Sequence, residues 1–172
     1  MKRAALVLIL LLGACREEVA QTVPDPVAMN GEALGHFCQM ALAEMDGPKA
    51  QIHLDGMPDP IFFAQVRDGV AYLKEPEKTM EIAAFYVSDL SVAPSWETPG
   101  AANWILAKEA FFVVGAPVVG GMGAPELAPF GIEADAIAFA TEIGGSVMRL
   151  IDIPPDAVLG AVERAVLDGA DG

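Results

Sequence analysis

Three observations predict an α+β protein, in which two small, similar ββαβ units follow a lipoprotein signal and a flexible tether. Short runs of β-branched and aromatic residues alternate with helical stretches in the order strand, strand, helix, strand, and this order occurs twice. Glycine and proline separate the runs, and we place the boundary between the units at residues 94–100. The chain also opens with an apolar export signal that ends in a cysteine.

The N-terminal residues 1–14 are expected to be a lipoprotein signal peptide. After a short positive start, residues 4–12 form an apolar run too short to span a bilayer as a helix. Residues 12–15, Leu-Gly-Ala-Cys, then match a lipobox, in which Cys15 is acylated and becomes the mature N-terminus. An ordinary signal peptide followed by an unrelated cysteine is the alternative. We expect a lipid-anchored protein that faces the periplasm, and Arg16, where an aspartate would retain it in the inner membrane, favours the outer membrane.

Composition limits the possible partners. Removal of the signal leaves 158 residues and changes the net charge from −14 to −16, because Lys2 and Arg3 are lost. This length suits one medium domain or two small ones. Such acidity argues against nucleic acid and against anionic lipid headgroups as partners.

Residues 15–33 are polar and broken by prolines, so we expect a flexible tether that holds the folded part away from the membrane. The folded part is expected to begin near Leu34. The first unit is predicted at residues 34–95, the second at 96–155, and a C-terminal helix and tail at 156–172.

The first unit is predicted to begin with a β-hairpin. Residues 37–45 and 49–54 are the expected strands, and the Asp-Gly pair between them is a favoured two-residue turn. A helix is expected over residues 59–73, where an aspartate can cap the N-terminus and a proline fits the first turn. Residues 80–90 are the expected third strand.

The second unit repeats this order loosely. Each half has a Gly-Met step ahead of its helix, Gly56-Met57 and Gly121-Met122, which suggests an internal duplication. The elements expected are strands at 103–106, 109–114 and 146–151, a glycine- and proline-rich loop at 115–125, and a helix that begins at residue 129 or 133 and ends at 143.

Cys38 is the cysteine left for chemistry once Cys15 is acylated. An unpaired thiol in an oxidising compartment suggests a retained purpose, although a buried, inert cysteine is the alternative. In a strand, Cys38 and Met40 would share one face, about 7 Å apart. A thiolate and a thioether are soft ligands that select Cu(I), and the thioether does not titrate.

Two ligands rarely suffice, so a third is expected from elsewhere in the fold. Met122 is the most suggestive, because it lies among glycines without apolar neighbours, where a methionine is exposed and movable. His36 is the alternative third ligand, since a continuous strand would place it on the face of Cys38 and Met40. The candidates considered are His36, Met45, His53, Met57, Met122 and Met148.

These features together resemble the NosL family, the copper-binding accessory lipoproteins of nitrous oxide reductase maturation. The resemblance runs in order from Phe37 to about Ile151. It is carried by the lipobox, by Cys-Gln-Met at 38–40, Gly-Pro-Lys-Ala-Gln-Ile at 47–52, Pro-Ile-Phe-Phe at 60–63, Gly-Met-Gly at 121–123 and Pro-Phe at 129–130.

The resemblance implies a protein that binds Cu(I) in the periplasm and delivers it to nitrous oxide reductase through the NosDFY transporter complex. It implies Cys38 and Met40 as two ligands and Met122 as the third. The family often has glycine at the place of Gln39, and little consequence is expected because a strand would point that side chain away from the metal. No enzymatic activity is expected.

Other classes of function remain open at this point. Cys38 as a nucleophile would need a histidine base, His36 or His53, but no motif supports it. A copper-sequestering lipoprotein would bind the same ion without serving the reductase, and a structural or adaptor lipoprotein would bind none. A metal site open at one position could also join two protomers as a homodimer.

Overall fold

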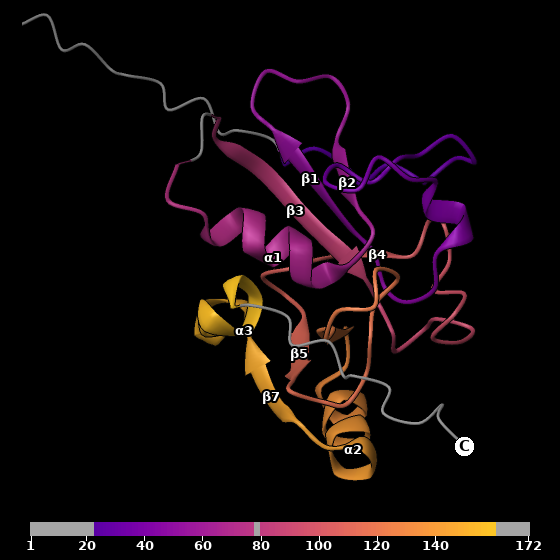
Figure 1. The fold of residues 1–172 in the computed structure, drawn as a ribbon, viewed down its shortest axis with the longest axis vertical. Coiled ribbons are helices and arrows are strands. Elements are labelled where there is room, and N and C mark those ends of the chain that lie inside the picture. Colours follow the sequence, from indigo (N-terminus) through magenta and orange to yellow (C-terminus); the bar gives the residue numbers. More distant parts are fainter. Residues whose placement is uncertain (1–22, 78–79, 161–172) are drawn as a thin grey trace, which may run out of the picture.

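The computed structural model describes residues 23–77 and 80–160, which form two antiparallel sheets (Figure 1). The first sheet has the strand order β2-β1-β3-β4 and the second has the order β6-β5-β7. The elements are β1 (Ala50–Leu54), β2 (Ile61–Phe63), α1 (Val66–Lys74), β3 (Ile82–Ser88), β4 (Trp104–Leu106), β5 (Phe111–Val114), β6 (Ala128–Phe130), α2 (Glu133–Ile143) and β7 (Ser146–Arg149), with the short helices η1 (Leu42–Glu44), η2 (Leu150–Asp152) and α3 (Asp156–Leu159).

The predicted fold of two similar ββαβ units is confirmed. In each sheet the first strand of the unit is central, paired on one side with the second strand and on the other with the strand that follows the helix. The first sheet has one additional strand, β4, which pairs with β3. This strand lies within residues 96–155, the range predicted for the second unit.

The predicted hairpin at residues 37–45 and 49–54 is wrong in its first strand. Residues 37–45 form a turn followed by η1, and β1 pairs instead with β2 in the register Ala50↔Phe63. In β2, Phe63 is buried in the main core. The helix α1 therefore begins at Val66 rather than in the predicted first turn.

The N-terminal boundary of the fold also differs from the prediction. Gln51 and Tyr86 point to the side of the first sheet away from the main core, and their polar groups bond to the preceding segment. The N–H of Val27 donates to Oε1 of Gln51 at 2.9 Å, and the Tyr86 hydroxyl donates to the carbonyl of Pro24 at 2.7 Å. The folded part therefore begins by Pro24 and not near Leu34.

The second unit differs from the prediction in two strands. The predicted strand at residues 103–106 is β4 of the first sheet, and β6, where no strand was predicted, pairs with β5 instead. The strands β5 and β7 lie within the predicted ranges, and α2 begins at Glu133, the later of the two predicted starts. Gly144 ends α2 with a φ of 106°, a conformation that glycine adopts readily. The predicted C-terminal helix is present as α3, and the rest of its range lies outside the described residues.

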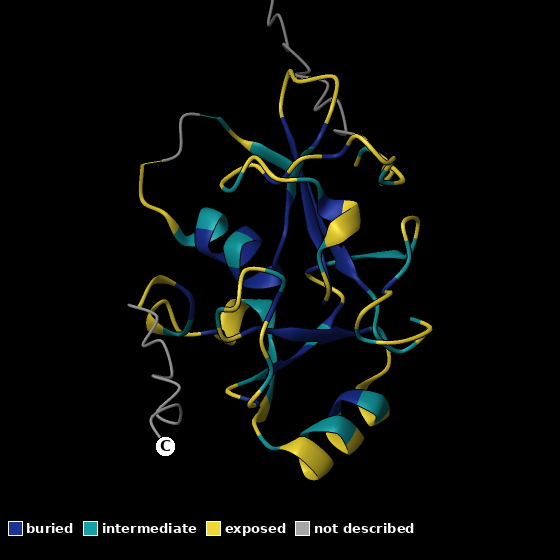
Figure 2. Ribbon diagram, turned by 45° about the vertical axis from the view of Figure 1, so that its right-hand side comes forward, coloured by how far each residue is buried: buried dark blue, intermediate teal, exposed yellow. Residues whose placement is uncertain are grey.

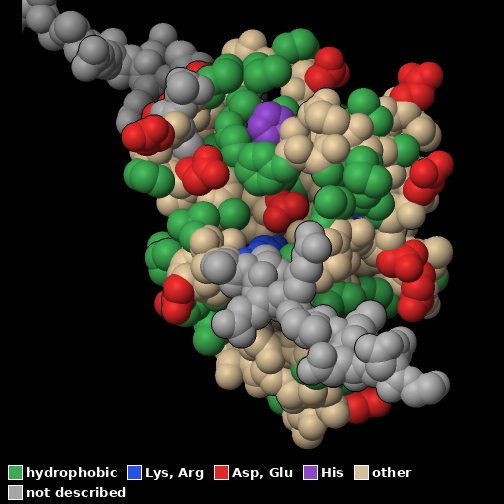
Figure 3. All heavy atoms as spheres, viewed as in Figure 1, with side chains coloured by type: hydrophobic (Ala, Val, Ile, Leu, Met, Phe, Trp, Pro, Cys, Tyr) green, Lys and Arg blue, Asp and Glu red, His purple; other side chains and the backbone are tan. Residues whose placement is uncertain are grey.

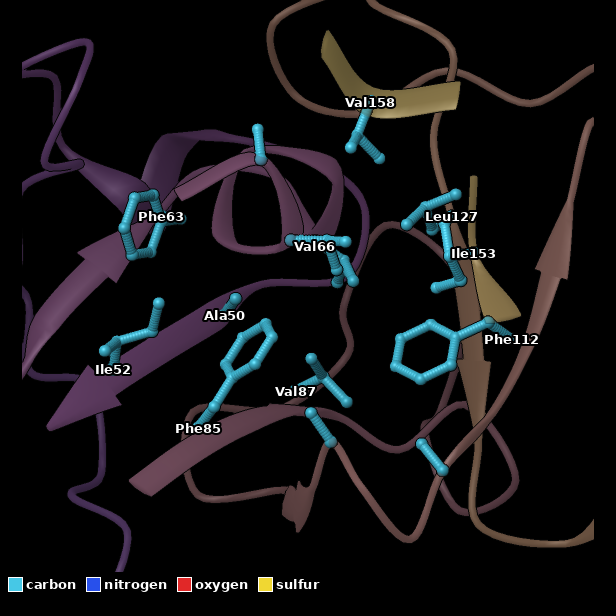
Figure 4. Close-up of a cluster of buried hydrophobic side chains, with 14 of the residues drawn as sticks. Ala50, Ile52, Phe63, Val66, Phe85, Val87, Phe112, Leu127, Ile153 and Val158 are labelled. Carbon is cyan, nitrogen blue, oxygen red and sulfur yellow. The ribbon is translucent and has the colours of Figure 1, made fainter. Parts of the chain in front are cut away.

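One hydrophobic core joins the two units. Phe85 and Val87 on β3 pack in the same cluster as Phe112 on β5, which Figure 4 shows pointing toward them. Full burial of such a side chain stabilises a fold by roughly 1.5–3 kcal/mol. Figure 2 shows this burial concentrated in the strands and α1, whereas much of α2 is exposed. Within residues 23–77 and 80–160, none of the helices has the length and apolar character needed to cross a bilayer.

Candidate metal centre

Cys38 and Met40 lie in a tight turn. The N–H of Gln39 donates to the carbonyl of Gly35 at 2.8 Å, and the N–H of Gly35 donates to the carbonyl of Met40 at 3.0 Å. The prediction that Cys38 and Met40 share one face of a strand is wrong, because these backbone groups bond within the turn and not to a neighbouring strand. The two Cα atoms nevertheless stay within roughly 7 Å, the reach of two residues.

Gln39 holds this turn, contrary to the expectation that its identity has little consequence. Its φ of 57° is left-handed, a conformation that glycine adopts without steric penalty, which explains glycine at this place in the resemblance. Its side-chain amide donates to the carbonyls of Gly35 and His36. These two hydrogen bonds stabilise the left-handed conformation, which glycine would adopt without them.

The thiol of Cys38 is free and half-buried. A Cβ atom built on Gly35 would lie 2.5 Å from its Sγ, so the sulfur packs directly over that glycine. Its neighbours form a small apolar cluster around Leu42 and Ala64. Met40, by contrast, is 52% exposed. The pair therefore has one sheltered sulfur and one open to solvent.

His36 turns toward a different environment. Its ring centroid lies 5.3 Å from that of Phe37, 5.6 Å from Phe63 and 5.7 Å from Tyr72. This aromatic group is distinct from the apolar cluster around Cys38. The His36 ring therefore packs among aromatic side chains in this conformation.

Met122 lies at the tip of a hairpin in the long loop between β5 and β6. The N–H of Gly120 donates to the carbonyl of Ala124 at 2.9 Å, and Gly123 closes the tip with a φ of 75°. Gln65, just ahead of α1, fixes this tip: its Oε1 accepts the N–H of Met122 at 3.0 Å and that of Ala124 at 3.4 Å. The backbone is held while the Met122 side chain remains 45% exposed.

The Cys38 turn and the Met122 hairpin meet across Ala64. A Cβ on Gly35 would lie 3.7 Å from the nitrogen of Ala64, and a Cβ on Gly121 would lie 3.5 Å from its carbonyl oxygen. The same position on Gly121 would be 2.8 Å from Cβ of Met45, a half-buried residue that packs in the cluster with Cys38. The fold thus brings together two segments more than 80 residues apart in the sequence.

Two buried charged residues support this arrangement. Glu126 accepts the N–H groups of Val66 at 3.1 Å and Arg67 at 2.8 Å, and so caps α1 from the other unit. Burial raises the pKa of Glu126 to about 8, against the effect of these bonds. Lys49 is also buried and donates through Nζ to the carbonyls of Asp46 and Gly47. Burial lowers the pKa of Lys49 to about 8.

The other candidates lie elsewhere. Met57 is in the short loop between β1 and β2, and Met148 lies in β7 against the main core. His53 is buried, with Nε2 3.1 Å from Oε1 of Gln51, and burial lowers its pKa. Cys15 and the signal peptide lie outside the described residues. In the part of the chain that the structure describes, no group of three His, Cys, Asp or Glu side chains converges as a metal cluster.

Sequence reasoning missed Gln65, Lys49 and Glu126. For Glu126 a signal was present, because this carboxylate stands in the otherwise apolar run of residues 124–130. A charged residue inside such a run is expected to be buried with dedicated hydrogen-bond partners.

The chain is similar to known proteins in both sequence and fold. The family model for NosL matches residues 26–158. The copper-binding lipoprotein NosL of Achromobacter cycloclastes is 49% identical over 162 residues, which is 94% of this chain and 83% of the relative. The protein of the same name from Stutzerimonas stutzeri is 34% identical over 139 residues, 80% of this chain and 70% of the relative.

Two solved structures have a fold similar to that of this chain. The crystal structure of the copper chaperone NosL from Shewanella denitrificans superposes with a TM-score of 0.70 at 31% identity, covering 75% of this chain and 95% of that one. The solution structure of apo-NosL from Achromobacter cycloclastes gives a TM-score of 0.50 at 48% identity, covering 67% of this chain and 92% of that one.

Proposed function

The chain belongs to the NosL family, and from this we propose that it binds Cu(I) and delivers copper for assembly of the copper centres of nitrous oxide reductase. The names of its relatives support copper binding: two are copper-binding lipoproteins and one is a copper chaperone. The oxidation state, the ligands and the destination of the copper are part of the proposal.

The proposed ligands are Cys38, Met40 and Met122. The observation that carries them is the meeting of the Cys38 turn and the Met122 hairpin on either side of Ala64. Three sulfur ligands suit Cu(I), which prefers soft donors. The thiolate contributes most of the affinity, and the thioethers add ligands that stay available when the pH falls.

The exposure of the sulfurs supports a carrier rather than a permanent site. Met40 and Met122 are each about half exposed, so an incoming ligand can replace them one at a time. Cys38 is sheltered and would leave the metal last. His36 remains the alternative third ligand, which would require its ring to leave the aromatic group formed with Phe63 and Tyr72.

The proposed location is the periplasmic side of the outer membrane, where acylated Cys15 anchors the chain. The proposed partner is the NosDFY transporter complex and, through it, nitrous oxide reductase. No catalytic role is proposed, because copper is the cargo and not a cofactor of a reaction.

The test of delivery compares cells that lack this protein with cells that express it or its Cys38→Ala variant. The copper content and activity of purified nitrous oxide reductase should be restored by the wild-type protein and not by Cys38→Ala at equal membrane abundance. A copper-sequestering lipoprotein would leave the reductase fully loaded in all three strains, and that outcome would refute delivery.

A further inference from the structure

A groove of about 530 Å³ lies at the C-terminal end of α1. It is lined by Leu73, Leu150 and Ile151, with Lys74, Lys108 and Arg149. Ile151 is 86% exposed, the highest value among the exposed large hydrophobic side chains of the described residues. The groove is therefore an apolar surface bordered by cations.

The distribution of cations over the molecule is uneven. The described residues include five Lys and Arg side chains, of which Lys49 and Arg67 are buried. The other three all line this groove. Arg149 is held there by stacking, with Cζ 4.3 Å from the ring centroid of Phe111, and by donation to the carbonyl of Lys108. In an acidic chain, this is the one described face that presents accessible cations.

The groove continues toward the N-terminus of the fold. A neighbouring hollow of about 170 Å³ shares Leu73, Lys108 and Leu150 with it and is also lined by Val23, the first described residue. Cys15 precedes Val23 by eight residues, which reach at most roughly 28 Å when extended. The chain therefore leaves the fold toward its acyl anchor beside the groove.

We infer that this face lies against the anionic surface of the membrane, with Ile151 at the interface and Lys74 and Lys108 near lipid phosphates. The inference goes beyond copper binding and rests on the acylation of Cys15 proposed above. Apolar side chains bordered by long cationic ones are the composition of surfaces that bind anionic membranes, where the cations reach the headgroups while their stems cover apolar area.

The net negative charge of the chain opposes anionic lipid, so the contact is confined to the groove face, where the three accessible cations of the described residues lie. Glu75, Glu109 and Asp152 follow the groove residues in sequence, so the face is close to balanced rather than strongly positive. Charges farther than about 8 Å are screened at physiological ionic strength. Figure 3 shows Asp and Glu side chains spread over one face of the molecule, with little Lys or Arg surface among them.

The test places a fluorophore on one of two exposed isoleucines. Ile151→Cys labels the groove, and Ile137→Cys is the matched control on α2, 51% exposed beside acidic residues. Both carry Cys38→Ser so that one thiol reacts. The mature acylated protein is reconstituted into phosphatidylcholine vesicles with or without phosphatidylglycerol, and quenching by a nitroxide-labelled lipid is measured.

Quenching at position 151 should exceed that at 137, and the excess should need phosphatidylglycerol and disappear at high salt. Lys74→Gln and Lys108→Gln should each lower the ratio of docked to undocked protein about fivefold. Equal quenching at both positions, or no dependence on phosphatidylglycerol, would overturn the inference. A protein that fails to float with the vesicles would overturn the anchor and this inference together, and would leave copper binding unaffected.

Discussion

The two ββαβ units share one topology but differ in the loop between their first two strands. In the first unit this loop spans only residues 55–60, and in the second it spans 115–127. Each loop carries a Gly-Met step, and Met57 and Met122 are almost equally exposed, at 43% and 45%. Only the longer loop folds back onto the other unit, so the candidate site depends on that fold-back and not on the Gly-Met step itself.

Each unit also accepts a hydrogen bond from the backbone at or just before the start of the other unit's helix, and the two contacts differ in burial. Glu126 of the second unit caps α1 from a fully buried position. In return, Oδ1 of Asp89, just after β3, accepts the N–H of Gly131 ahead of α2 at 2.7 Å, at a partly exposed position. Because unsatisfied groups cost most when buried, the contact at α1 should matter more than the contact at α2.

Removal of the buried cap should have the largest effect. Glu126→Ala leaves the N–H groups of Val66, Arg67 and Leu127 without their carboxylate partner. The free energy of unfolding should fall by about 3 kcal/mol. Urea unfolding of the soluble domain measures this value, and a loss below about 1 kcal/mol would show that Glu126 does not join the units.

The same carboxyl should make stability depend on pH. Burial raises its pKa from the ordinary 4.5 to about 8, so its contribution is present below about pH 4.5 and is lost as the pH rises through about 8. Across this window, the free energy of unfolding should fall more steeply for the wild-type protein than for Glu126→Gln, which cannot titrate. Parallel pH profiles of the two proteins would contradict the assignment.

Gly120 tests the close approach of the long loop. A Cβ there would lie 2.5 Å from Oε2 of Glu126 and 2.7 Å from Cγ of Gln65. Gly120→Ala should destabilise the fold by about 2 kcal/mol through overpacking. Gly31→Ala is the control, since nothing lies within 4 Å of its Cβ position. Equal melting temperatures for the two variants would mean that the loop tolerates a shift.

The weaker contact at α2 should give the smallest effect. Asp89→Ala removes the acceptor of the Gly131 N–H and of the Ser91 N–H, both part-buried. A loss of about 1 kcal/mol is expected, as for a helix cap. Denaturation of Asp89→Ala beside Glu126→Ala checks the order, and a larger loss for Asp89→Ala would reverse the comparison.

The fold was predictable from the sequence where periodicity reflects burial. The strands β1, β3, β5 and β7 and the helix α2 all lie within the predicted ranges, because their apolar side chains face a core. The run at residues 37–45 has a similar composition and is a turn with η1. Composition does not show whether a neighbouring strand is available to bond, and here β2 takes the place beside β1.

The sequence indicates the candidate ligands, which stay a prediction, but it does not indicate the shape of the segments that carry them. Cys38, Met40 and Met122 stand out by chemistry and by isolation in the sequence. Their approach depends on Gln65 and Glu126, whose roles appear only when the two units are packed together. The left-handed backbone conformation of Gln39 could not be predicted either, because glutamine is not a residue type that indicates a positive φ.

We propose that the long loop of the second unit supplies a copper ligand and that the short loop of the first does not. An anaerobic Cu(I) titration against a competing chelator tests it directly, with Met122→Leu beside its matched control Met57→Leu. We predict that the wild-type protein binds one equivalent of Cu(I) tightly and that Cys38→Ala does not. The Cu(I) affinity should fall at least about tenfold in Met40→Leu and in Met122→Leu. It should be unchanged in Met57→Leu. Equal affinities for Met122→Leu and Met57→Leu, with a loss in His36→Ala, would contradict the claim and move the third ligand to His36.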